Sequence, residues 1–552
     1  MAEKLKIIPL GGLNEIGKNM TVYECAGDII VVDCGVAFPD SDMFGIDLVI
    51  PDMSYLVKHK NRVRAVVITH GHEDHVGAVP FLLRQLKVPI YCTRLTAGLI
   101  DIKLEEHHLK HESDVRTMEA GQTFKAGCFS VEFIRVNHSI ADAVSLAITT
   151  PLGVVVHTGD FKIDSTPVGA QVIDLARFGQ LGNQGVLALL SDSTNVERPG
   201  YAMSERKVGE TLDGLFKGCD QRIIVTTFAS NVHRIQQIID AAVKYNRKVA
   251  ITGRSMENIL RVAIQLDYMD IPPGTIMELS QIKGMPRHKV VIVTTGSQGE
   301  PMSALYRMAI SGHKQVEIGA GDRVIISASS IPGNEKMVSK VINELFRKGA
   351  DVIYEKLADV HVSGHACQEE LKLMLALTRP QYFMPVHGEF RHLRAHASLA
   401  RQTGVNPKHI FVGDLGQVLT ISEQGAKYTG TVQAGRLLID GLGVGDVGSV
   451  VLRDRKVLAE DGLIVVVVTL DAATGQVAAG PDIVSRGFVY VKESEALMED
   501  MRRLASQALD MCHENHINEW SSIKSAVKSA LSDYLFKKIK RTPMILPVIM
   551  ES

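Results

Sequence analysis

Three histidines and one aspartate stand within six consecutive residues of this chain, in the string His70-Gly71-His72-Glu73-Asp74-His75. After a single threonine, Thr69, the string follows the apolar run 65–68, which predicts a buried strand that ends just before the histidines. A loop leaving a strand can turn alternate side chains to one side, so His70 and His72 could share one ion while Asp74 and His75 reach a second. Imidazole and carboxylate groups suit Zn²⁺ or Mn²⁺. The sequence therefore predicts a metal site at a strand end.

Two ions need more ligands than one loop can provide, and three further candidates stand just past apolar runs. They are His138, Asp160 and His387. Taken alone, each could be an ordinary structural residue, but their repeated placement at strand ends indicates that they share one site. Asp160 is the natural bridging carboxylate, since one ligand must touch both ions to hold them about 3.5–4 Å apart.

The composition is that of a cytoplasmic globular protein. Of its 552 residues, 45% are hydrophobic and 22% charged, and the length allows about three or four domains. The seven cysteines are scattered without a C-x-x-C pair, which argues against a disulfide framework or a cysteine-ligated zinc finger. We expect no signal peptide and no membrane span, because the longest apolar run, near 463–470, is too short. With a net charge of −2, a polyanion would have to bind in a local groove.

The spacing of apolar runs changes along the chain. Up to about residue 205, short strands end at polar residues, whereas over 206–365 strands alternate with helix-like segments. This alternation predicts a parallel sheet with helices on its faces. After residue 366 the first style returns, and from about 445 a Val-rich strand precedes a helical stretch over 494–511.

Further strings indicate a family. They are Gly11-Gly12-Leu13-Asn14-Glu15-Ile16-Gly17-Lys18-Asn19, Ser191-Asp192-Ser193-Thr194-Asn195, Thr295-Gly296-Ser297-Gln298-Gly299-Glu300-Pro301-Met302, His361-Val362-Ser363-Gly364-His365, Pro385-Val386-His387-Gly388-Glu389 and Ser485-Arg486-Gly487-Phe488-Val489. The metal loop resembles that of the metallo-β-lactamase superfamily, and the inserted block is similar to that of its β-CASP nucleases. Together, the strings resemble the bacterial ribonuclease J family over essentially the whole chain. The metal loop alone would also fit a thioesterase or a lactamase, whereas the combination is specific.

The resemblance implies an α/β fold: a metallo-β-lactamase αββα sandwich, split by a parallel βαβ (β-CASP) domain and followed by a small α+β domain. On this chain, the first part of the sandwich would span 1–205, the β-CASP domain 206–365 and the last part of the sandwich 366–430. A linker at 431–448 and a C-terminal domain at 449–552 would complete the molecule.

The resemblance also implies roles for single residues. One ion would be held by His70, His72, His138 and Asp160, and the second by Asp74, His75, Asp160 and His387. Zn²⁺ is the expected ion, with Mn²⁺ or Mg²⁺ as alternatives. The catalytic residues would be Asp74, Asp192 and His365. We expect His365 to act as a general acid or to hold the scissile phosphate, with a structural hydrogen bond as its alternative, and Asp192 to join catalysis or only to orient a metal-bound histidine.

An RNA that enters by its 5′ end needs a phosphate pocket, and small polar turns that open helices are suited to anions. Such turns stand at 229–231, 295–298 and 329–334. By resemblance, the substrate channel would be lined by Ser230, Asn231, Val232, His361, Val362, Ser363, Gly364 and His365. Arg254, Arg323 and Lys162 would contact the RNA backbone or else be solvated surface charges. Asp47 and Asp440 fall where some relatives carry a structural calcium ion.

The function implied is that of a two-metal ribonuclease. It would act as a 5′-to-3′ exonuclease on 5′-monophosphorylated RNA and as an endonuclease on single-stranded RNA, in mRNA turnover and the maturation of ribosomal RNA 5′ ends. Expected partners are RNA, further copies of the chain in a homodimer or homotetramer, and other RNA-decay proteins, with no membrane. Two rivals stay open: an RNA-binding or scaffolding subunit with weak catalysis, and a small-ester hydrolase of the same superfamily, which would have no need of the long insert.

Overall fold

The computed structural model describes residues 3–40, 42–169, 171–300, 302–331, 334–441, 443–472, 474–488 and 495–552. Pro301, Pro332, Gly333 and Val489, which belong to strings and turns quoted above, lie outside the described residues. The chain forms two compact units, one of Met1–Phe38 with Val49–Leu437 and one of Pro39–Leu48 with Leu438–Ser552. No helix among the described residues combines the length and apolar character that crossing a membrane requires.

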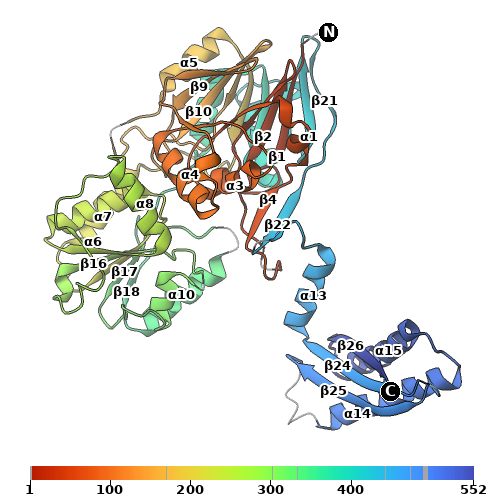
Figure 1. Cartoon of the computed structure of the whole chain (residues 1–552). Helices are drawn as coiled ribbons and strands as arrows, with labels where there is room; N and C mark the ends of the chain where they lie inside the picture. Colours follow the sequence, from red (N-terminus) through yellow and green to blue (C-terminus); the bar gives the residue numbers. More distant parts are fainter. Residues whose placement is uncertain are drawn as a thin grey trace. The chain divides into compact units, whose positions relative to one another are not determined.

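Two β-sheets face each other in the first unit, and a hydrophobic core drawn from both lies between them (Figure 1). Across the first sheet the strands are β21 (Gly425–Thr431), β20 (Gln417–Ser422), β1 (Leu5–Gly11), β2 (Met20–Cys25), β3 (Asp28–Val32), β5 (Val63–Val67), β6 (Ile90–Cys92) and β7 (Val115–Thr117). Across the second they are β19 (Tyr382–Val386), β12 (Val186–Asp192), β11 (Gly153–His157), β10 (Val144–Thr150), β9 (Phe129–Arg135) and β8 (Thr123–Ala126).

Helices complete the sandwich on its outer sides. Apolar side chains of α5, α11 and α12 form a second core against the outer face of the second sheet, and α4 contacts β7 of the first. The helices of this part are α1 (Ser54–Lys58), α2 (Glu73–Val76), α3 (Val79–Leu83), α4 (Arg94–Glu106), α5 (Leu175–Gln184), α11 (Gln368–Thr378) and α12 (Phe390–Gln402), with short 3-10 turns at Lys60–Arg62, Lys110–Glu112 and Pro407–His409. These layers confirm the predicted αββα sandwich.

The inserted block forms a third, six-stranded sheet in which every pair of neighbours is parallel. Its strands, in order, are β15 (Ile276–Met277), β14 (Lys248–Thr252), β16 (Val290–Thr294), β13 (Ile223–Thr226), β17 (Arg323–Ile326) and β18 (Asp351–Ile353). Helices pack on both faces, which confirms the predicted βαβ block: α6 (Glu205–Phe216), α7 (Val232–Lys244) and α8 (Arg254–Gln265) on one, and α9 (Ala304–Ala309) and α10 (Glu335–Arg347) on the other, with a 3-10 turn at Arg287–Lys289.

The C-terminal part has a sheet with helices on one face only. The strands β25 (Val477–Arg486), β24 (Leu463–Leu470) and β26 (Met544–Glu551) pack one face against α14 (Glu495–Glu514) and α15 (Trp520–Ile539). Upstream lie α13 (Ser449–Glu460) and a small sheet of β4 (Leu48–Pro51), β22 (Arg436–Asp440) and β23 (Gly443–Val444). Two of these strands fall in the range 431–448 that we expected to be a linker, and the exact domain boundaries stay a prediction.

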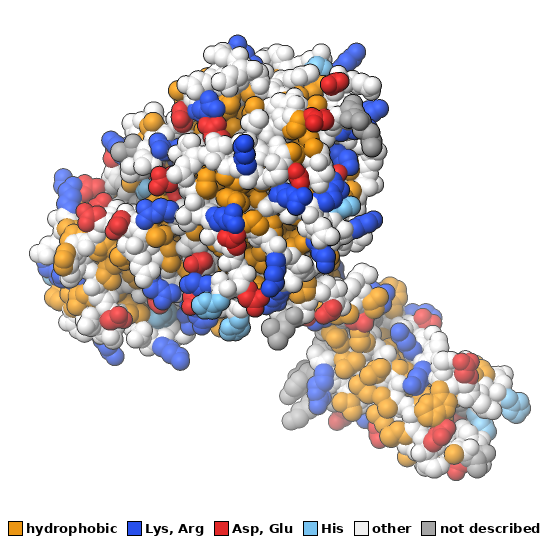
Figure 2. Space-filling view, turned by 45° about the horizontal axis from the view of Figure 1, so that its top comes forward, with side chains coloured by type: hydrophobic (Ala, Val, Ile, Leu, Met, Phe, Trp, Pro, Cys, Tyr) orange, Lys and Arg blue, Asp and Glu red, His pale blue; other side chains and the backbone are white. Residues whose placement is uncertain are grey.

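The surface matches the balanced composition. On the face seen in Figure 2, side chains of both charge signs are interspersed over the first unit, while hydrophobic side chains cover a broad area of the second.

Strand direction explains where the polar residues meet. In the second sheet β11, β12 and β19 are parallel neighbours, so their carboxyl ends lie at one edge of the sheet. Asp192 is the last residue of β12, His387 follows β19 directly, and Asp160 lies three residues after β11. In the first sheet, β3 and β5 are parallel and lead into Asp33 and the 70–75 loop. Both sheets thus deliver chemically active side chains from strand ends.

Candidate metal centre

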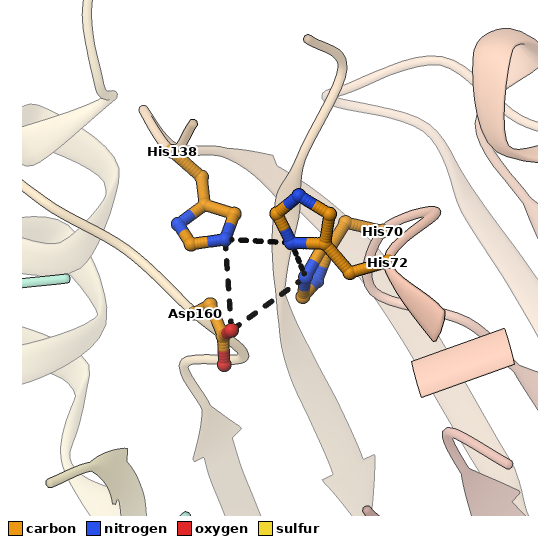
Figure 3. Close-up of side chains that lie close together, drawn as sticks. All are labelled: His70, His72, His138 and Asp160. Carbon is orange, nitrogen blue, oxygen red and sulfur yellow. Dashed lines mark hydrogen bonds and ion pairs between the residues drawn. The ribbon is translucent and has the colours of Figure 1, made fainter. Parts of the chain in front are cut away.

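His70, His72, His138 and Asp160 converge from three loops (Figure 3). The Nδ1 atom of His72 lies 3.0 Å from Nε2 of both His70 and His138. The Oδ2 atom of Asp160 lies 3.6 Å from the same two Nε2 atoms. The ligand atoms of these four residues all lie within 4.8 Å of one another, which is close enough for one ion to reach them all.

A second cluster of four shares Asp160 with the first. Its other members are Asp74, His75 and His387, and its ligand atoms again lie within 4.8 Å of one another. The Nε2 atom of His75 lies 3.3 Å from Asp160 Oδ2 and 3.5 Å from Asp74 Oδ2, which in turn lies 3.2 Å from His387 Nε2. The structure thus brings together all seven residues predicted as metal ligands, in the two predicted sets, and Asp160 and His387 also form a third cluster with Asp192 and His365.

The outward-facing ring nitrogens show that these residues fit a cation. His138 Nδ1 lies 2.7 Å from the carbonyl oxygen of Gly364, which can only accept a hydrogen bond, so in the neutral ring Nε2 keeps its lone pair toward the cluster. His75 Nδ1 lies 2.7 Å from the Asp33 carboxylate and His387 Nδ1 lies 2.7 Å from the Thr194 hydroxyl. Such outer partners orient metal-binding histidines.

Asp160 supports the same conclusion. Its Oδ1 atom is buried and has no hydrogen-bond partner among the described residues, and His387 Nδ1 lies 3.6 Å from it. A buried carboxylate oxygen without a donor costs free energy unless a positive charge lies beside it. Converging lone pairs and an unpartnered carboxylate oxygen therefore form a donor set that suits a divalent ion.

The electrostatics of the two clusters differ. Burial lowers the pKa of His72 to about 4 and holds the pKa of His70 and His138 well below the ordinary value. Burial alone would also lower the pKa of His75 and His387, but the surrounding carboxylates, Asp160 foremost, together outweigh it, and both pKa values lie well above the usual range. The first cluster is therefore a set of neutral imidazoles, and the second is rich in paired charges.

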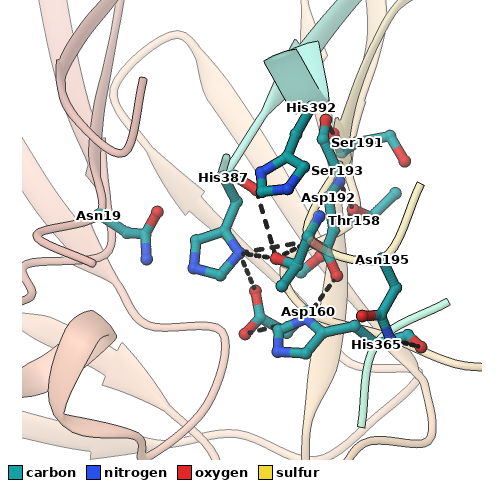
Figure 4. Close-up of polar contacts among 12 residues, drawn as sticks. Asn19, Thr158, Asp160, Ser191, Asp192, Ser193, Asn195, His365, His387 and His392 are labelled. Carbon is teal, nitrogen blue, oxygen red and sulfur yellow. Dashed lines mark hydrogen bonds and ion pairs between the residues drawn. The ribbon is translucent and has the colours of Figure 1, made fainter. Parts of the chain in front are cut away.

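Asp192 connects His365 to the second cluster (Figure 4). Its Oδ2 atom lies 2.8 Å from His365 Nδ1, and its Oδ1 atom lies 3.3 Å from His387 Nδ1. The same Oδ1 accepts hydrogen bonds from the backbone N–H and the hydroxyl of Thr194, at 2.9 and 2.7 Å. Although burial opposes it, the Asp192 carboxylate raises the pKa of His365. The Asp192 carboxylate thus contacts both His365, the predicted general acid or phosphate clamp, and His387, a predicted metal ligand.

The loop 361–365 fits closely against the first cluster. A Cβ atom at Gly364 would stand 2.7 Å from His138 Nδ1, so only glycine allows this approach. The Ser363 hydroxyl oxygen accepts hydrogen bonds from Asn195 Nδ2 at 2.7 Å and from the backbone N–H of His365 at 3.2 Å. Val362 packs in the core, whereas His361 Nδ1 is buried with no hydrogen-bond partner among the described residues.

The other predicted substrate residues lie at the start of α7. Asn231 Oδ1 accepts a hydrogen bond from the Arg234 backbone N–H at 3.0 Å and so caps the helix. Val232 is buried in an apolar cluster that joins the insert to the sandwich, and Ser230 is half-buried. Two of these three side chains are thus engaged in the fold, and the channel stays a prediction for them.

Two expected backbone contacts of RNA have internal partners instead. Lys162 is only 2% exposed, and its Nζ lies 3.5 Å from Asp164 Oδ2 and 3.1 Å from the Met203 carbonyl oxygen. This burial does not fit a solvated surface charge, and it does not fit a side chain that contacts RNA. Arg323 pairs with Asp351 at 2.7 Å.

The predicted calcium residues lie near each other in the second unit. Asp47 Oδ2 accepts a hydrogen bond from the backbone N–H of Gly441 at 2.8 Å, beside Asp440. The guanidinium of Arg455 pairs with Asp440 and already supplies a positive charge there. Among the described residues, no ligand cluster includes Asp47 or Asp440, so the calcium site stays a prediction.

Asp33 is a central residue of the site that the sequence reasoning missed. Besides facing His75, its carboxylate accepts hydrogen bonds from the backbone N–H and the hydroxyl of Thr69, at 2.8 and 2.9 Å. Asn19 Nδ2 lies 3.1 Å from His75 Nε2, on the cluster side of that ring. Asp33 directly follows the apolar run 29–32, so the strand-end rule used for Asp160 and His387 could have found it.

Comparison with known proteins identifies the family. The family described as Ribonuclease J, beta-CASP domain matches residues 220–345, and Ribonuclease J C-terminal domain matches 450–552. The Metallo-beta-lactamase superfamily matches 13–170, and Zn-dependent metallo-hydrolase RNA specificity domain matches 349–412. Ribonuclease J2 of Bacillus subtilis (strain 168) is 45% identical over 550 residues, covering 100% of this chain and 99% of that protein. The chain belongs to the ribonuclease J family.

Other relatives agree. Ribonuclease J 1 of Streptococcus pyogenes is 45% identical over 99% of this chain and 97% of that protein, and ribonuclease J of Thermus thermophilus is 44% identical over 100% and 96%. A solved structure of a protein of unknown function from Enterococcus faecalis V583 shares the fold, with a TM-score of 0.54 and 16% identity over 76% of this chain and 100% of that one. Membership in the ribonuclease J family confirms the predicted enzyme class, a metal-dependent ribonuclease, and the predicted fold class.

Proposed function

We propose that this ribonuclease J family member uses two divalent ions to cleave RNA, as a 5′-to-3′ exonuclease on 5′-monophosphorylated RNA and as an endonuclease on single-stranded RNA. The observation that carries the proposal is the pair of ligand clusters that share Asp160. A shared carboxylate is what holds two ions close together in two-metal hydrolases. The five imidazoles of the set favour Zn²⁺, with Mn²⁺ and Mg²⁺ as alternatives.

Proton transfer to the leaving group is the step in which this chain's own residues act most directly. Bound ions would supply a water molecule activated near neutral pH and positive charge for the phosphoryl oxygens. Because Asp192 takes the Nδ1–H of His365, the Nε2 atom of that ring is left to give a proton to the departing 3′-oxygen. Asp192 then has both predicted roles, since it holds His365 and also orients His387.

The preference for a 5′-monophosphate would come from the loop 361–365 and the turn 230–232. The Ser363 hydroxyl and the unpartnered His361 Nδ1 are the polar groups of this loop nearest in sequence to His365. A monophosphate would fit such a pocket, whereas a triphosphate would be too bulky and too highly charged. In the cell we expect this activity to serve mRNA turnover and ribosomal RNA 5′-end maturation in the cytoplasm, beside other RNA-decay proteins.

A time course on one single-stranded RNA tests the proposal. The RNA carries a labelled 5′-monophosphate or 5′-triphosphate, and reactions contain Zn²⁺, Mn²⁺ or Mg²⁺, with EDTA as the control. Early release of labelled mononucleotide from the monophosphate form alone would support the 5′-anchored exonuclease. Long labelled fragments from both forms would mean that internal cutting dominates and would refute the pocket. RNA binding without cleavage would favour the scaffolding rival, and hydrolysis of thioesters but not RNA would favour the ester hydrolase.

We also propose that the chain self-associates through the open face of the sheet formed by β25, β24 and β26. Val465 on the middle strand pairs with Val484 on one side and Leu546 on the other, and the latter two are 45% and 51% exposed. Apolar rows of this kind are usually covered by a partner. Sedimentation of the full chain should show a dimer or tetramer that Val484→Asp with Leu546→Asp dissociates, whereas Met511→Asp, on the exposed side of α14, should not.

A further inference from the structure

A second basic site lies in the inserted block, at the carboxyl ends of β14 and β16. It is a cavity of about 530 Å³ whose polar lining includes Arg254, Ser255, Thr295, Ser303, Arg307 and Glu106. Ligands of α/β proteins commonly bind at this edge of a parallel sheet, and the volume suits a small ligand or one segment of a longer one. None of these residues belongs to the metal clusters or to the predicted substrate channel at 230–232 and 361–365, although Arg254 and the turn at Thr295 were candidates for RNA or anion contact on the sequence alone.

Local backbone geometry shapes the cavity wall. Gly253 follows β14 with a φ of 118°, and a Cβ atom there would stand 2.5 Å from the Thr295 hydroxyl oxygen. Glycine therefore lets the end of β16 approach the start of α8. Helix α8 has twelve residues and no side-chain cap, so its first backbone N–H groups and the positive end of its dipole lie at the cavity.

The two arginines of the cavity have no counter-ions. Among the described residues, neither Arg254 nor Arg307 forms an ion pair, and Arg307 Nε is buried without a hydrogen-bond partner. A buried guanidinium donor without an acceptor is unfavourable until an acceptor binds. Guanidinium groups pair with phosphate oxygens in a two-pronged geometry, and the neighbouring hydroxyls of Thr295 and Ser303 can donate further hydrogen bonds. The chemistry of the lining therefore selects a phosphate group.

Helix α4 connects this cavity to the metal loop. Leu99 lies against Gly71, where an added Cβ would meet its side chain at 2.6 Å, and Lys103 pairs with Glu73 at 2.5 Å. Glu106, at the end of the same helix, lines the cavity. The rise of an α-helix puts about 10 Å of helix between Leu99 and Glu106. One RNA strand can therefore reach both the metal loop and the cavity.

We propose that this cavity binds a phosphate group of the RNA substrate at a position away from the cleaved bond. The inference rests on the proposed ribonuclease function and adds a second anchoring point to it. A free nucleotide carries the same phosphate chemistry, so the tests separate the two sources. Because the arginines touch the substrate away from the reacting atoms, they contribute to binding of long RNA and not to the chemical step.

The test compares the full-length double variant Arg254→Ala with Arg307→Ala against the wild type, both loaded with metal. We expect the KM for a long single-stranded RNA to rise about 10-fold with kcat nearly unchanged. The slope of log affinity against log salt should fall by about 0.7 for each phosphate contact that is lost. Hydrolysis of bis(p-nitrophenyl) phosphate and of a dinucleotide, which cannot span both sites, should stay at the wild-type level.

Two controls exclude a general effect of charge. Arg347→Ala with Lys348→Ala removes the same charge at the end of α10, outside the cavity, and should leave the KM for RNA unchanged. Glu106→Gln removes the one acidic side chain of the lining and should lower the KM, because it weakens repulsion of the phosphate. A damaged fold would not produce this opposite change.

Titration of inorganic phosphate and of AMP, followed by calorimetry, distinguishes the source of the phosphate. If both bind the wild type but not the double variant while the KM for RNA is unaffected, the phosphate site stands and its ligand is a free nucleotide. If the double variant equals the wild type in RNA kinetics, salt dependence and phosphate binding, the inference is overturned. Failure of the proposed function is a separate result, namely a wild type that cleaves no RNA with any of the three metals.

Discussion

The metal centre and the cavity lined by Arg254 and Arg307 differ in whether their polar groups have partners within the chain. In the metal centre, ring nitrogens that point away from the clusters have partners within the chain, as His75 has Asp33 and His138 has the Gly364 carbonyl. In the cavity, the guanidinium groups of Arg254 and Arg307 have no ion-pair partner among the described residues. The first region is held in one geometry before substrate arrives, whereas the second keeps its charges available to substrate.

This difference matches what each region has to do. Catalysis needs reacting groups fixed to within a fraction of an ångström, and hydrogen bonds from outer residues provide that precision. Binding a phosphate needs charge and reach, because every nucleotide presents the same group. We therefore expect substitutions in the metal centre to lower kcat, and substitutions in the cavity to raise the KM for long RNA.

The largest effect is expected for Asp160→Ala, because Asp160 belongs to both clusters. RNA cleavage should fall to the level of the EDTA control, and the metal content of the purified protein should fall below that of the wild type. Metal analysis with an RNA cleavage assay measures both. Cleavage close to the wild-type rate, with two ions still bound, would contradict the assignment of the bridging carboxylate.

His365→Asn should lower kcat by about 10²- to 10⁴-fold, which is the usual contribution of a general acid. The metal content should not change, since His365 is outside both predicted ligand sets; a lower content would instead show that the third cluster, which includes His365, holds an ion. Single-turnover kinetics separate the roles left open by the sequence. If a leaving group that needs no protonation, such as p-nitrophenolate, restores most of the rate, His365 is the acid; if it restores none, His365 clamps the phosphate.

Asp33→Asn tests the outer partners of the metal centre. It weakens the contact that orients His75 and should lower metal affinity or activity about 10- to 100-fold. Asp52→Asn is the matched control, because Asp52 is also a buried carboxylate but accepts from the Ser54 backbone and faces Gln433. Metal titration of both apo-variants measures the difference, and equal losses would mean that any buried carboxylate of the sandwich has this effect.

The predicted ligands obey a local rule in the sequence, which Asp33 also obeys, whereas the contacts of other supporting residues follow no such rule. The seven predicted ligands stand in loops that follow apolar runs, which made them candidates, and the family resemblance divided them into two sets. Thr194 and Asn19 stand in strings that were quoted, but Thr194 contacts His387 and Asn19 contacts Asp74, so their contacts depend on which strands lie side by side within each sheet. The strand order of a sheet is a property of the whole chain.

Side chains in the insert show what carrying roles over by position does not specify, namely the contacts that each side chain makes within the fold. The turn at Asn231 and Val232 was expected to contact substrate, yet one side chain caps α7 and the other is buried in the core. Arg254 was left between an RNA contact and a solvated charge, and only the structure reveals that it lines a cavity with Arg307. These two arginines are more than fifty residues apart, and the parallel pairing of β14 with β16 places the starts of α8 and α9 at the same edge of the sheet.

The smallest expected effects come from removing a single threonine hydroxyl. Because the same group can be removed in the metal centre and in the cavity, these two variants compare the regions most directly. Thr194→Val deletes a hydroxyl that contacts both Asp192 and His387, so kcat should fall about 10-fold or more while the KM changes little. Thr295→Val deletes one hydroxyl of the cavity lining, where solvent and the arginines can compensate, so we expect about a 2-fold rise in the KM for long RNA and no change in kcat. Steady-state kinetics on one long RNA decide the matter: if both variants lower kcat alike, the cavity is part of the catalytic network and the contrast between fixed and available charges is lost.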